Sequence, residues 1–389
     1  MRHLGHNRAG RWERQVAGYR AFIPAPLPPH PPIDLTPALQ KLYSDAALAL
    51  GRLDGSIQTL PNPDLFVFMY VRREAVLSSQ IEGTRSSLQD LLAAEAHVYA
   101  ADKDVAEVVN YVRAMNHGLA RLSELPVSTR LIREIHERLL DGVRGSRLGP
   151  GELRRSRNWI GPAGCTLNEA SFVPPPAEMV PQALGDLERF LHGGDELPIL
   201  IKIGIAHAQF ETIHPFLDGN GRVGRLLITF LLCESGVLHK PVLYLSHYFK
   251  RHRPRYYELL QDIRDNGAWE EWLGFFLRGV ADVSAEAATT AARIVTLRET
   301  HRNLIGTNLG YAVGNGHRLL EHLFERPIVS VNDVIEVTGT SYPSANQLVE
   351  RLVNLGILAE ITGRTRNRRF RYNNYVSLFE EADAGPPLR

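Results

Sequence analysis

The sequence predicts a mostly α-helical protein that carries one small β-hairpin and ends in a winged helix-turn-helix domain. Three observations support this fold class. Helix-start and helix-end residues recur between residues 64 and 300, and one Gly-, Pro- and Asn-rich stretch interrupts them at residues 151–176. From residue 316 onward, three short helical patterns precede a basic turn between two strand patterns, which is the order of a winged helix.

The chain has 389 residues, of which 44% are hydrophobic, and a net charge of +1. This length is too great for one ordinary core, so we expect two or three domains. The two cysteines, Cys165 and Cys233, lie far apart, which excludes a disulfide scaffold and is typical of a reducing compartment. Because we find neither a membrane-length apolar run nor a secretory signal, we expect a cytoplasmic protein without a membrane partner.

We divide the chain into three parts. Residues 1–110 are expected to form an N-terminal arm and helical domain, residues 111–305 a larger helical domain, and residues 306–389 a linker and the winged-helix domain. The arm includes a Pro-rich stretch, residues 22–39, whose fixed φ angles and missing N–H groups predict an extended backbone.

Three helices of the N-terminal half have clear boundaries. The first begins near Asp64 and ends at Gly83, a favourable C-terminal residue. The second begins directly afterwards, because Ser86 and Gln89 match a capping box. The third covers residues 128–142 and carries one apolar stripe between its capping serine and its closing glycine.

The later elements follow from the same signals. Residues 151–176 alternate short apolar patches with turn residues, which predicts two strands in a β-hairpin over residues 158–173. Further helices are expected over residues 178–191, 198–210, 222–234 and 254–266, and from 269 toward 300. The glycine-rich residues 305–317 are expected to be a linker.

The stretch that decides the function lies at residues 212–232, TIHPFLDGNGRVGRLLITFLL. Gly219, Gly221 and Gly224 have the G-x-G-x-x-G spacing of a dinucleotide-binding turn. However, Pro215 stands where that motif needs a central parallel strand, and no acidic residue near Tyr244 could hold a ribose. The sequence therefore excludes the dinucleotide site.

The same residues predict a phosphate site at the start of a helix. Gly219, Asn220 and Gly221 permit a tight turn with converging N–H groups, and the following helix adds its positive end. Arg222 and Arg225 lie one turn apart and can both present guanidinium groups to phosphate oxygens.

Two further residues of this loop add chemistry to the phosphate site. Asp218 is placed like a ligand of Mg²⁺, which takes one or two carboxylates and otherwise binds phosphates and water. His214 is the only nearby group that can accept a proton at neutral pH. Taken singly, such a histidine is more often a core residue, but the combination favours a metal-nucleotide site with a base.

Residues 214–225 match, at every defined position, the H-x-F-x-[DE]-G-N-G-R-x-x-R signature, and the chain thereby resembles the Fic-domain proteins. The stretches SSQIEGTRSSLQDLL, GELRRSRNWIG and YLSHYFKRHRPRYYELLQDIRDNGAWEEWL are similar to bacterial Fic proteins with an N-terminal helical domain and a C-terminal winged helix. The resemblance covers nearly the whole chain, and it implies a Fic-type helical bundle with residues 111–305 as the catalytic domain.

The resemblance implies protein adenylylation, the transfer of AMP from ATP to a Ser, Thr or Tyr hydroxyl of a target protein. In that activity His214 would be the general base, and Asp218 would hold Mg²⁺, with Mn²⁺ as the alternative ion. The expected ATP-binding residues are Gly219, Asn220, Gly221, Arg222, Val223, Gly224, Arg225, Tyr256 and Tyr257. Gly221 favours AMP transfer, because the family branch that transfers a phosphate has lysine after the asparagine.

Residues 158–173 resemble the family's flap, in which an exposed strand pairs with an extended segment of the target. The residues expected to contact the target are Ile160, Gly161, Phe172 and Val173.

Residues 78–83 fit the family's inhibitory pattern [ST]-x-x-x-E-[GN]. The resemblance implies that Glu82, held just before Gly83 by a hydrogen bond from Ser78, pairs with Arg225 and forces ATP into an unproductive pose. In some relatives the glutamate instead positions water that removes AMP, so a deadenylylase stays an alternative.

The winged helix supports a competing hypothesis. Its wing carries Arg364, Arg366, Arg368, Arg369 and Arg371, and its candidate recognition helix carries Ser341, Tyr342, Ser344, Asn346 and Gln347. These residues suit duplex DNA, so the chain could be a transcriptional regulator whose Fic body senses a nucleotide. The alternative is a packing or dimerisation module. The sequence leaves the target protein and the oligomeric state, a homodimer included, open.

Overall fold

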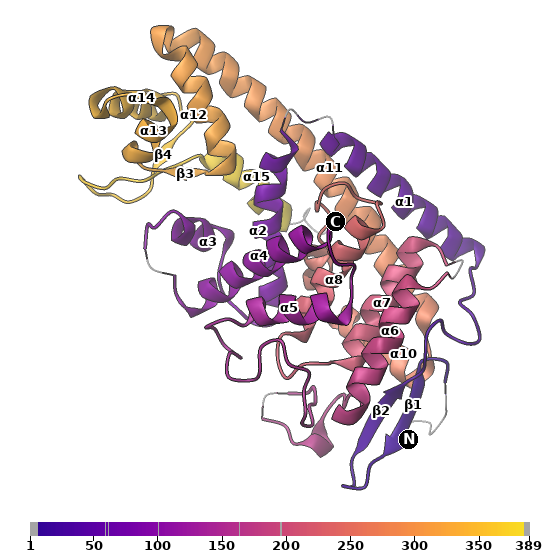
Figure 1. The fold of residues 1–389 in the computed structure, drawn as a ribbon. Helices are drawn as coiled ribbons and strands as arrows, with labels where there is room; N and C mark the ends of the chain where they lie inside the picture. The colour runs from indigo at the N-terminus through magenta and orange to yellow at the C-terminus, as the bar shows by residue number, and fades with distance from the viewer. Residues whose placement is uncertain are drawn as a thin grey trace.

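The computed structural model describes residues 7–58, 60, 62–99, 101–162, 164–194 and 197–384, and it is mostly helical (Figure 1). The α-helices are α1 (Pro37–Gln58), α2 (Pro63–Ile81), α3 (Leu88–Glu95), α4 (Lys103–Arg121), α5 (Thr129–Leu139), α6 (Val180–His192), α7 (Ile199–Ile213), α8 (Asn220–Glu234), α9 (Ser246–Arg251), α10 (Arg253–Asn266), α11 (Trp269–Asn308), α12 (Val313–Glu325), α13 (Val331–Thr338), α14 (Tyr342–Asn354) and α15 (Asn373–Ala384). The strands are β1 (Gly10–Arg14), β2 (Arg20–Pro24), β3 (Ile328–Val329), β4 (Ala359–Glu360) and β5 (Phe370–Arg371). Among the described residues, none of the helices combines the length and apolarity that crossing a membrane requires.

Helix α11 is the longest element, with 40 residues, and it links the two ends of the molecule (Figure 1). Helix α1 packs along it, and α12 and α15 contact it as well. At 1.5 Å per residue, α11 extends over roughly 60 Å. The larger helical body and the C-terminal domain are therefore joined by one continuous helix.

Helix α7 is the centre of the body. Its residues from Leu200 to Ile213 are all buried, and it packs against α6, α8, α10 and α11. A helix that is covered on all sides belongs to the interior of a larger domain. Both ends of the 214–220 loop are therefore held by buried helices.

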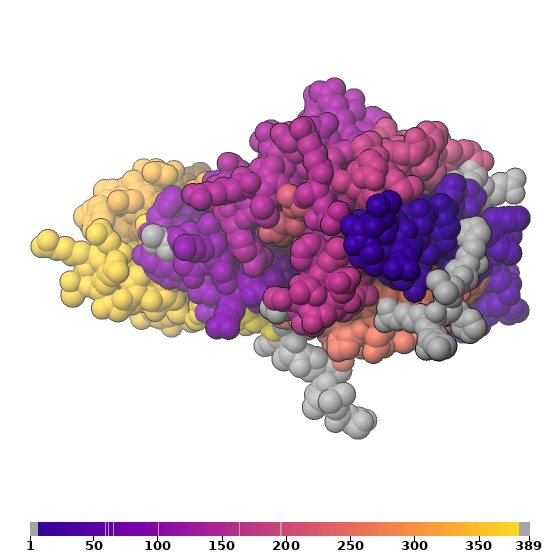
Figure 2. Space-filling model, turned by 90° about the horizontal axis from the view of Figure 1, so that it is seen from below, coloured from indigo at the N-terminus to yellow at the C-terminus, as the bar shows by residue number. Residues whose placement is uncertain are grey.

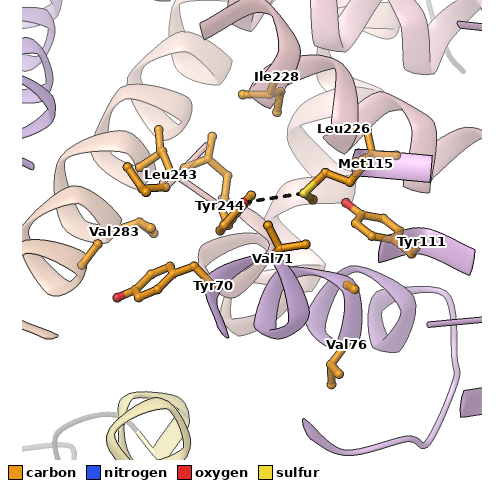
Figure 3. Close-up of a cluster of buried hydrophobic side chains, with 14 of the residues drawn as sticks. Tyr70, Val71, Val76, Tyr111, Met115, Leu226, Ile228, Leu243, Tyr244 and Val283 are labelled. Carbon is orange, nitrogen blue, oxygen red and sulfur yellow. Dashed lines mark hydrogen bonds between the residues drawn. The ribbon is translucent and has the colours of Figure 1, made fainter. Parts of the chain in front are cut away.

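A second part of the core lies beneath α2 (Figure 3). The ring of Tyr70 stacks on Phe66 at 4.1 Å between centroids, and Tyr244 donates its hydroxyl to Met115 Sδ at 3.6 Å. Tyr70 also makes an edge contact, at 5.4 Å, with Phe379 of α15. The last helix of the chain thus packs directly on α2.

The predicted helix boundaries hold well where capping residues mark them. Asn62 accepts from the Asp64 N–H at the start of α2, Ser128 accepts from the Leu131 N–H at the start of α5, and Gly83 has φ +100°. The predicted N-cap of α3 is one residue too early. The prediction is a capping box of Ser86 with Gln89, whereas the structure has a capping box of Ser87 with Asp90.

The N-terminal arm is extended at its start, as predicted, but it forms an unexpected sheet there and its end is helical. Strands β1 and β2 form an antiparallel hairpin, in which Trp12 is opposite Phe22, and α1 begins already at Pro37. Proline is tolerated in the first turn of a helix, and Thr36 caps α1 by accepting from the Leu39 N–H. The many prolines before this point concealed these signals.

The predicted β-hairpin at residues 158–173 is also wrong in its detail. A single bridge joins Ile160 and Phe172, and a 3-10 turn, Leu167–Glu169, lies between them. The Phe22 N–H donates to the Val173 carbonyl at 2.9 Å, so strand β2 of the arm pairs with this segment. Figure 2 shows the indigo arm beside the magenta flap region.

The C-terminal elements α12, α13, α14 and a three-stranded sheet in the order β3-β5-β4 are consistent with a winged helix. The expected linker over residues 305–317 is reduced in the structure to Leu309 and a 3-10 turn, Gly310–Ala312, because α11 ends at Asn308 and α12 begins at Val313. Gly316 permits this, since a Cβ there would lie 2.5 Å from Leu309 Cδ1. The proposed divisions at residues 110 and 305 fall inside the continuous helices α4 and α11.

We expect Gly118→Ala to destabilise the protein by about 1–3 kcal/mol, because overpacking a core costs about that much. A Cβ at position 118 of α4 would lie 2.4 Å from the Phe230 ring of α8. Gly185→Ala in α6 is the matched control, since a Cβ there meets nothing within 4 Å. Equal urea-unfolding midpoints for the two variants would contradict the prediction.

Candidate functional site

The loop between α7 and α8 has an unusual backbone at both ends. His214 ends α7 in the left-handed region, with φ 49°, and Gly219 precedes α8 with φ 79°. The Asn220 side chain closes the loop, because its Oδ1 accepts from the Phe216 N–H and its Nδ2 donates to the Phe216 carbonyl, both at 2.8 Å. Both polar atoms of the Asn220 side chain therefore form hydrogen bonds within the loop. The backbone N–H of Asn220 is left to bind a ligand.

The start of α8 offers free hydrogen-bond donors. In the described part of the chain, the N–H groups of Asn220, Gly221 and Arg222 have no acceptor. Together with the positive end of the helix they suit an anion. A Cβ on Gly221 would lie 2.3 Å from Glu82 Oε1, so the chain's own carboxylate lies against this helix end.

Glu82, the residue after α2, makes an ion pair with Arg225 of α8. Arg225 Nη2 donates to Glu82 Oε1 at 2.7 Å, and the Arg225 side chain is only 2% exposed. Ser78 accepts from the same guanidinium twice, through Oγ at 2.8 Å and through its carbonyl at 3.0 Å. We expected Ser78 to bind Glu82, but it holds Arg225 instead.

The charge state of the pair follows from its surroundings. Burial alone would raise the pKa of Glu82, but the neighbouring Arg225 guanidinium outweighs burial and lowers it. Burial alone would lower the pKa of Arg225, but the Glu82 charge together with the nearby tyrosines raises it. Both partners are charged at neutral pH, and they bring together two helices whose paired residues lie 143 positions apart.

Arg222 is fully buried and contacts α4, whereas Arg225 contacts α2. Its Nη1 donates to Glu107 Oε2 at 3.1 Å, and its Nη2 lies 3.6 Å from Asp218 Oδ1. Arg222 Nε and Nη2 have no hydrogen-bond partner among the described residues. Glu107 was not predicted from the sequence, because a lone glutamate on an amphipathic helix carries no signal. Burial raises the pKa of Glu107.

Asp218 has the features of a carboxylate that could hold a cation. Its Oδ1 accepts from the Gly219 N–H at 2.6 Å, and its side chain is 30% exposed. Among the described residues, no group of three or more His, Cys, Asp and Glu side chains gathers around a metal position. One carboxylate fits an ion that takes its other ligands from phosphates and water.

His214 presents a neutral imidazole. Burial lowers its pKa to about 3, helped by the charges of Arg154 and Arg264. Its Nδ1 is buried without a hydrogen-bond partner in the described chain. The ring is therefore unprotonated at neutral pH and available to accept a proton.

Arg154 holds the backbone of this loop and was missed as a separate site residue. It donates through Nε to the His214 carbonyl at 2.8 Å and through Nη2 to the Pro175 carbonyl at 2.5 Å, and its N–H donates to the Pro215 carbonyl at 2.9 Å. Its charge lies at the C-terminal end of α7, where a cation is favourable. The only signal in the sequence was its place in the stretch GELRRSRNWIG.

Three of the expected nucleotide-binding residues lie in the interior. Val223 is buried in the core, and the Gly224 carbonyl accepts from the ring of His207 at 2.9 Å. The Tyr256 hydroxyl bonds the same ring at 2.9 Å. Tyr257 is 40% exposed and can present its ring to a ligand.

The flap residues divide into an inner and an outer group. Phe172 is buried beneath the Arg264 guanidinium, 3.7 Å from the ring centroid, and the Val173 carbonyl is bound by β2. Ile160 is 36% exposed on the outer side. At Gly161, a Cβ would lie 2.5 Å from Cys165 Sγ. Of the four expected contact residues, Ile160 and Gly161 are exposed, whereas Phe172 and Val173 are buried.

We expect the His214 ring not to titrate between pH 5 and 8, because burial depresses its pKa to about 3. NMR of histidine-labelled protein would test this, with His214→Ala identifying the resonance. A His214 midpoint above pH 5.5 would contradict the buried neutral state.

Comparison with known proteins agrees with this geometry. Residues 40–120 match the model of the Fic/DOC family N-terminal region, and residues 126–232 match that of the Fic/DOC family. A probable protein adenylyltransferase of Aquifex aeolicus is 31% identical over 180 residues, which are 45% of this chain and 51% of that protein. A protein adenylyltransferase Fic of Drosophila ananassae is 28% identical over 181 residues, or 46% of this chain and 32% of that protein.

The chain thus spans about half, or less, of the length of these curated relatives. Among solved structures, a Fic family protein from Desulfovibrio desulfuricans has the same fold, with a TM-score of 0.57 and 21% identity, over 88% of this chain and 97% of that one. The N-terminal match covers α1 to α4 and the second match covers α5 to α8. On these grounds, residues 40–120 and 126–232 of the chain carry the N-terminal region and the domain of the Fic/DOC family.

Proposed function

We propose that this protein is an adenylyltransferase that moves AMP from ATP to a Ser, Thr or Tyr hydroxyl of a target protein. The observation that carries the proposal is the α7–α8 loop, which joins the neutral imidazole of His214, the part-exposed carboxylate of Asp218 and the free N–H groups of α8. The names of the curated relatives support the same activity.

The reaction is an in-line displacement at the α-phosphorus of ATP. His214 takes the proton of the target hydroxyl, the hydroxyl oxygen bonds to phosphorus, and the bond to the β-phosphate oxygen breaks, so that pyrophosphate leaves. The N–H groups at residues 220–222 stabilise the charge that develops on the phosphate. Asp218 would hold Mg²⁺ or Mn²⁺, which supplies neutralisation of phosphate charge when it is bound.

The target would be held in an extended form along the flap. The N–H and carbonyl of Ile160 are bonded to Phe172 and Ser171 within the flap, so its exposed side chain and the main chain of the exposed Gly161 would meet the target, with Phe172 and Val173 behind them. Main-chain pairing positions a hydroxyl without reading much of the surrounding sequence. This arrangement suits Ser, Thr and Tyr alike.

Glu82 would act as an internal inhibitor. Its carboxylate lies against Gly221 and pairs with Arg225, so it takes both the helix end and the guanidinium that ATP phosphates need. Two anions cannot share this site without strong repulsion. ATP binding in the productive pose therefore requires Glu82 to leave, and Ser78 would keep Arg225 in place in either state.

We expect Glu82→Gly to raise the transfer of label from α-labelled ATP to protein by at least about tenfold, the effect of about 1.4 kcal/mol. The Glu82→Gly/His214→Ala variant should show no label, because the base is missing. Assays with Mg²⁺ and cell lysate as the source of targets provide the measurement. Equal labelling of wild type and Glu82→Gly at saturating ATP would refute the inhibitory role.

The same assay separates the alternatives for Glu82. If Glu82 positions water that removes AMP, protein labelled by the Glu82→Gly variant should lose label after wild-type protein is added. Stable label under those conditions supports inhibition alone. No label in any variant would instead favour a regulator that senses a nucleotide.

A second candidate function, DNA binding, rests on the winged-helix domain. Arg364 and Arg366 of the wing are exposed and have no acidic partner in the described chain, and residues 341–344 at the start of α14 are exposed. By contrast, Arg368 bonds Asn346, and Arg369 lies 3.5 Å from Asp333. Two free arginines would position a duplex through its phosphates.

We expect Arg364→Ala/Arg366→Ala to weaken DNA binding in a gel shift by about tenfold. The slope of the logarithm of affinity against the logarithm of salt concentration should become less steep, by the equivalent of two phosphate contacts at most. Arg318→Ala, an exposed arginine of α12, is the control. Absence of a shift for the wild type at 50 mM salt would exclude this function.

A further inference from the structure

The N-terminal helices and the winged-helix domain enclose a cavity of about 710 Å³. Its first wall comes from α2, α3, α4 and the connection between α3 and α4, and its second wall comes from β3, the residues before it, α13 and the wing. In Figure 1 the winged-helix domain lies next to α3 and α4. Small-molecule sites in proteins have volumes of about 300–1,000 Å³.

The floor of this cavity is apolar. Leu92 of α3, Val112 of α4 and Ile328 of β3 line it and are buried. Phe68 of α2 adds an aromatic ring, and Tyr99, which is 49% exposed, adds a second one near the opening. An apolar or aromatic body would be more favourable here than water.

The rim of the cavity is positively charged. Arg113 and Arg326, one from each wall, are exposed and make no ion pair or hydrogen bond through their side chains within the described residues. Two further arginines of the lining do have acidic partners. Arg72 pairs with Glu95 at 2.7 Å, and Arg369 lies 3.5 Å from Asp333. The lining therefore holds four guanidinium groups against two carboxylates.

Contacts outside the cavity hold the two walls together. Gln89 of α3 donates to Glu380 of α15 at 2.8 Å, and Phe379 of α15 packs on Tyr70 of α2. Helix α12 also contacts α2. The cavity is therefore preformed in the single chain, and filling it does not require the walls to be brought together.

We propose that this cavity is a second ligand site, and that it binds a small organic anion with an aromatic body. An inorganic anion would satisfy Arg113 and Arg326 but leave the apolar floor in contact with water. A neutral aromatic molecule would fill the floor but leave the two guanidinium groups without a partner. A phosphate or carboxylate attached to an aromatic ring matches both features, since guanidinium groups bind such oxygens in pairs.

The ligand would touch the helix that carries the proposed inhibitory residue. Phe68 and Arg72 of α2 line the cavity, and Glu82 follows the same helix ten residues later. At 1.5 Å per residue the two points lie roughly 15 Å apart along the helix. The site is thus separate from the α7–α8 loop, and its existence does not depend on the proposed activity.

The test is titration calorimetry with 1-naphthyl phosphate and the full chain. We expect one site with a dissociation constant below about 1 mM, and at least tenfold weaker binding of both inorganic phosphate and 1-naphthol. The Arg113→Ala/Arg326→Ala variant should bind 1-naphthyl phosphate about tenfold more weakly. Arg113→Lys/Arg326→Lys should lose less affinity than the alanine variant, because it keeps the charge but not the paired guanidinium hydrogen bonds.

The matched control is Arg14→Ala/Arg318→Ala, which removes two exposed arginines outside the cavity. Its affinity should equal that of the wild type. Absence of binding, or an equal loss in the control and in the Arg113→Ala/Arg326→Ala variant, would overturn the proposal. Circular dichroism of each variant checks the fold. The outcome is independent of protein labelling, so a failed adenylylation assay leaves it intact.

Discussion

The open N-terminus of α8 is the constraint on which the site depends. Buried N–H groups need an acceptor, and the helix end adds a partial positive charge, so this point has to be matched by an anion. In the present structure Glu82 lies against it, while Arg225 provides the countercharge. A phosphate chain has the same charge and the same hydrogen-bonding capacity. One physical requirement thus accounts for both the proposed substrate site and the proposed inhibitor.

The remaining buried charges are arranged around this point. Arg222 is held by Glu107, and Arg154 is held by carbonyl groups, with no carboxylate bonded to it in the part of the chain that the structure describes. Buried cations are expensive unless they are paired or hydrogen-bonded, so a fold that keeps them needs another use for them. Arg154 connects the His214 loop to the flap. This connection fixes the position of His214, the proposed base, relative to the flap edge that would hold the target. Among the described residues, two guanidinium nitrogens of Arg222 have no hydrogen-bond partner, and one of them lies close to the Asp218 carboxylate.

Helix α2 connects the parts of the molecule. Its C-terminal end supplies Ser78 and Glu82, its centre packs on Tyr244 and on Phe379 of the last helix, and Phe68 and Arg72 line the cavity beside the winged-helix domain. A displacement of this helix would change all three contacts together. The C-terminal domain and the α8 site thus contact the same helix.

The sequence by itself determined the local features. The spacing of residues 214–225 predicted the loop and the helix start, and capping serines and glycines predicted the ends of α2 and α5, because these signals act over a few residues. Tertiary structure decided the partners: Ser78 binds Arg225 and not Glu82, Asn220 closes the loop, and β2 pairs with the flap. Glu107 and Arg154 became recognisable only there. Such contacts join residues far apart in the chain, and no local pattern specifies which of several polar partners will be nearest once the helices pack.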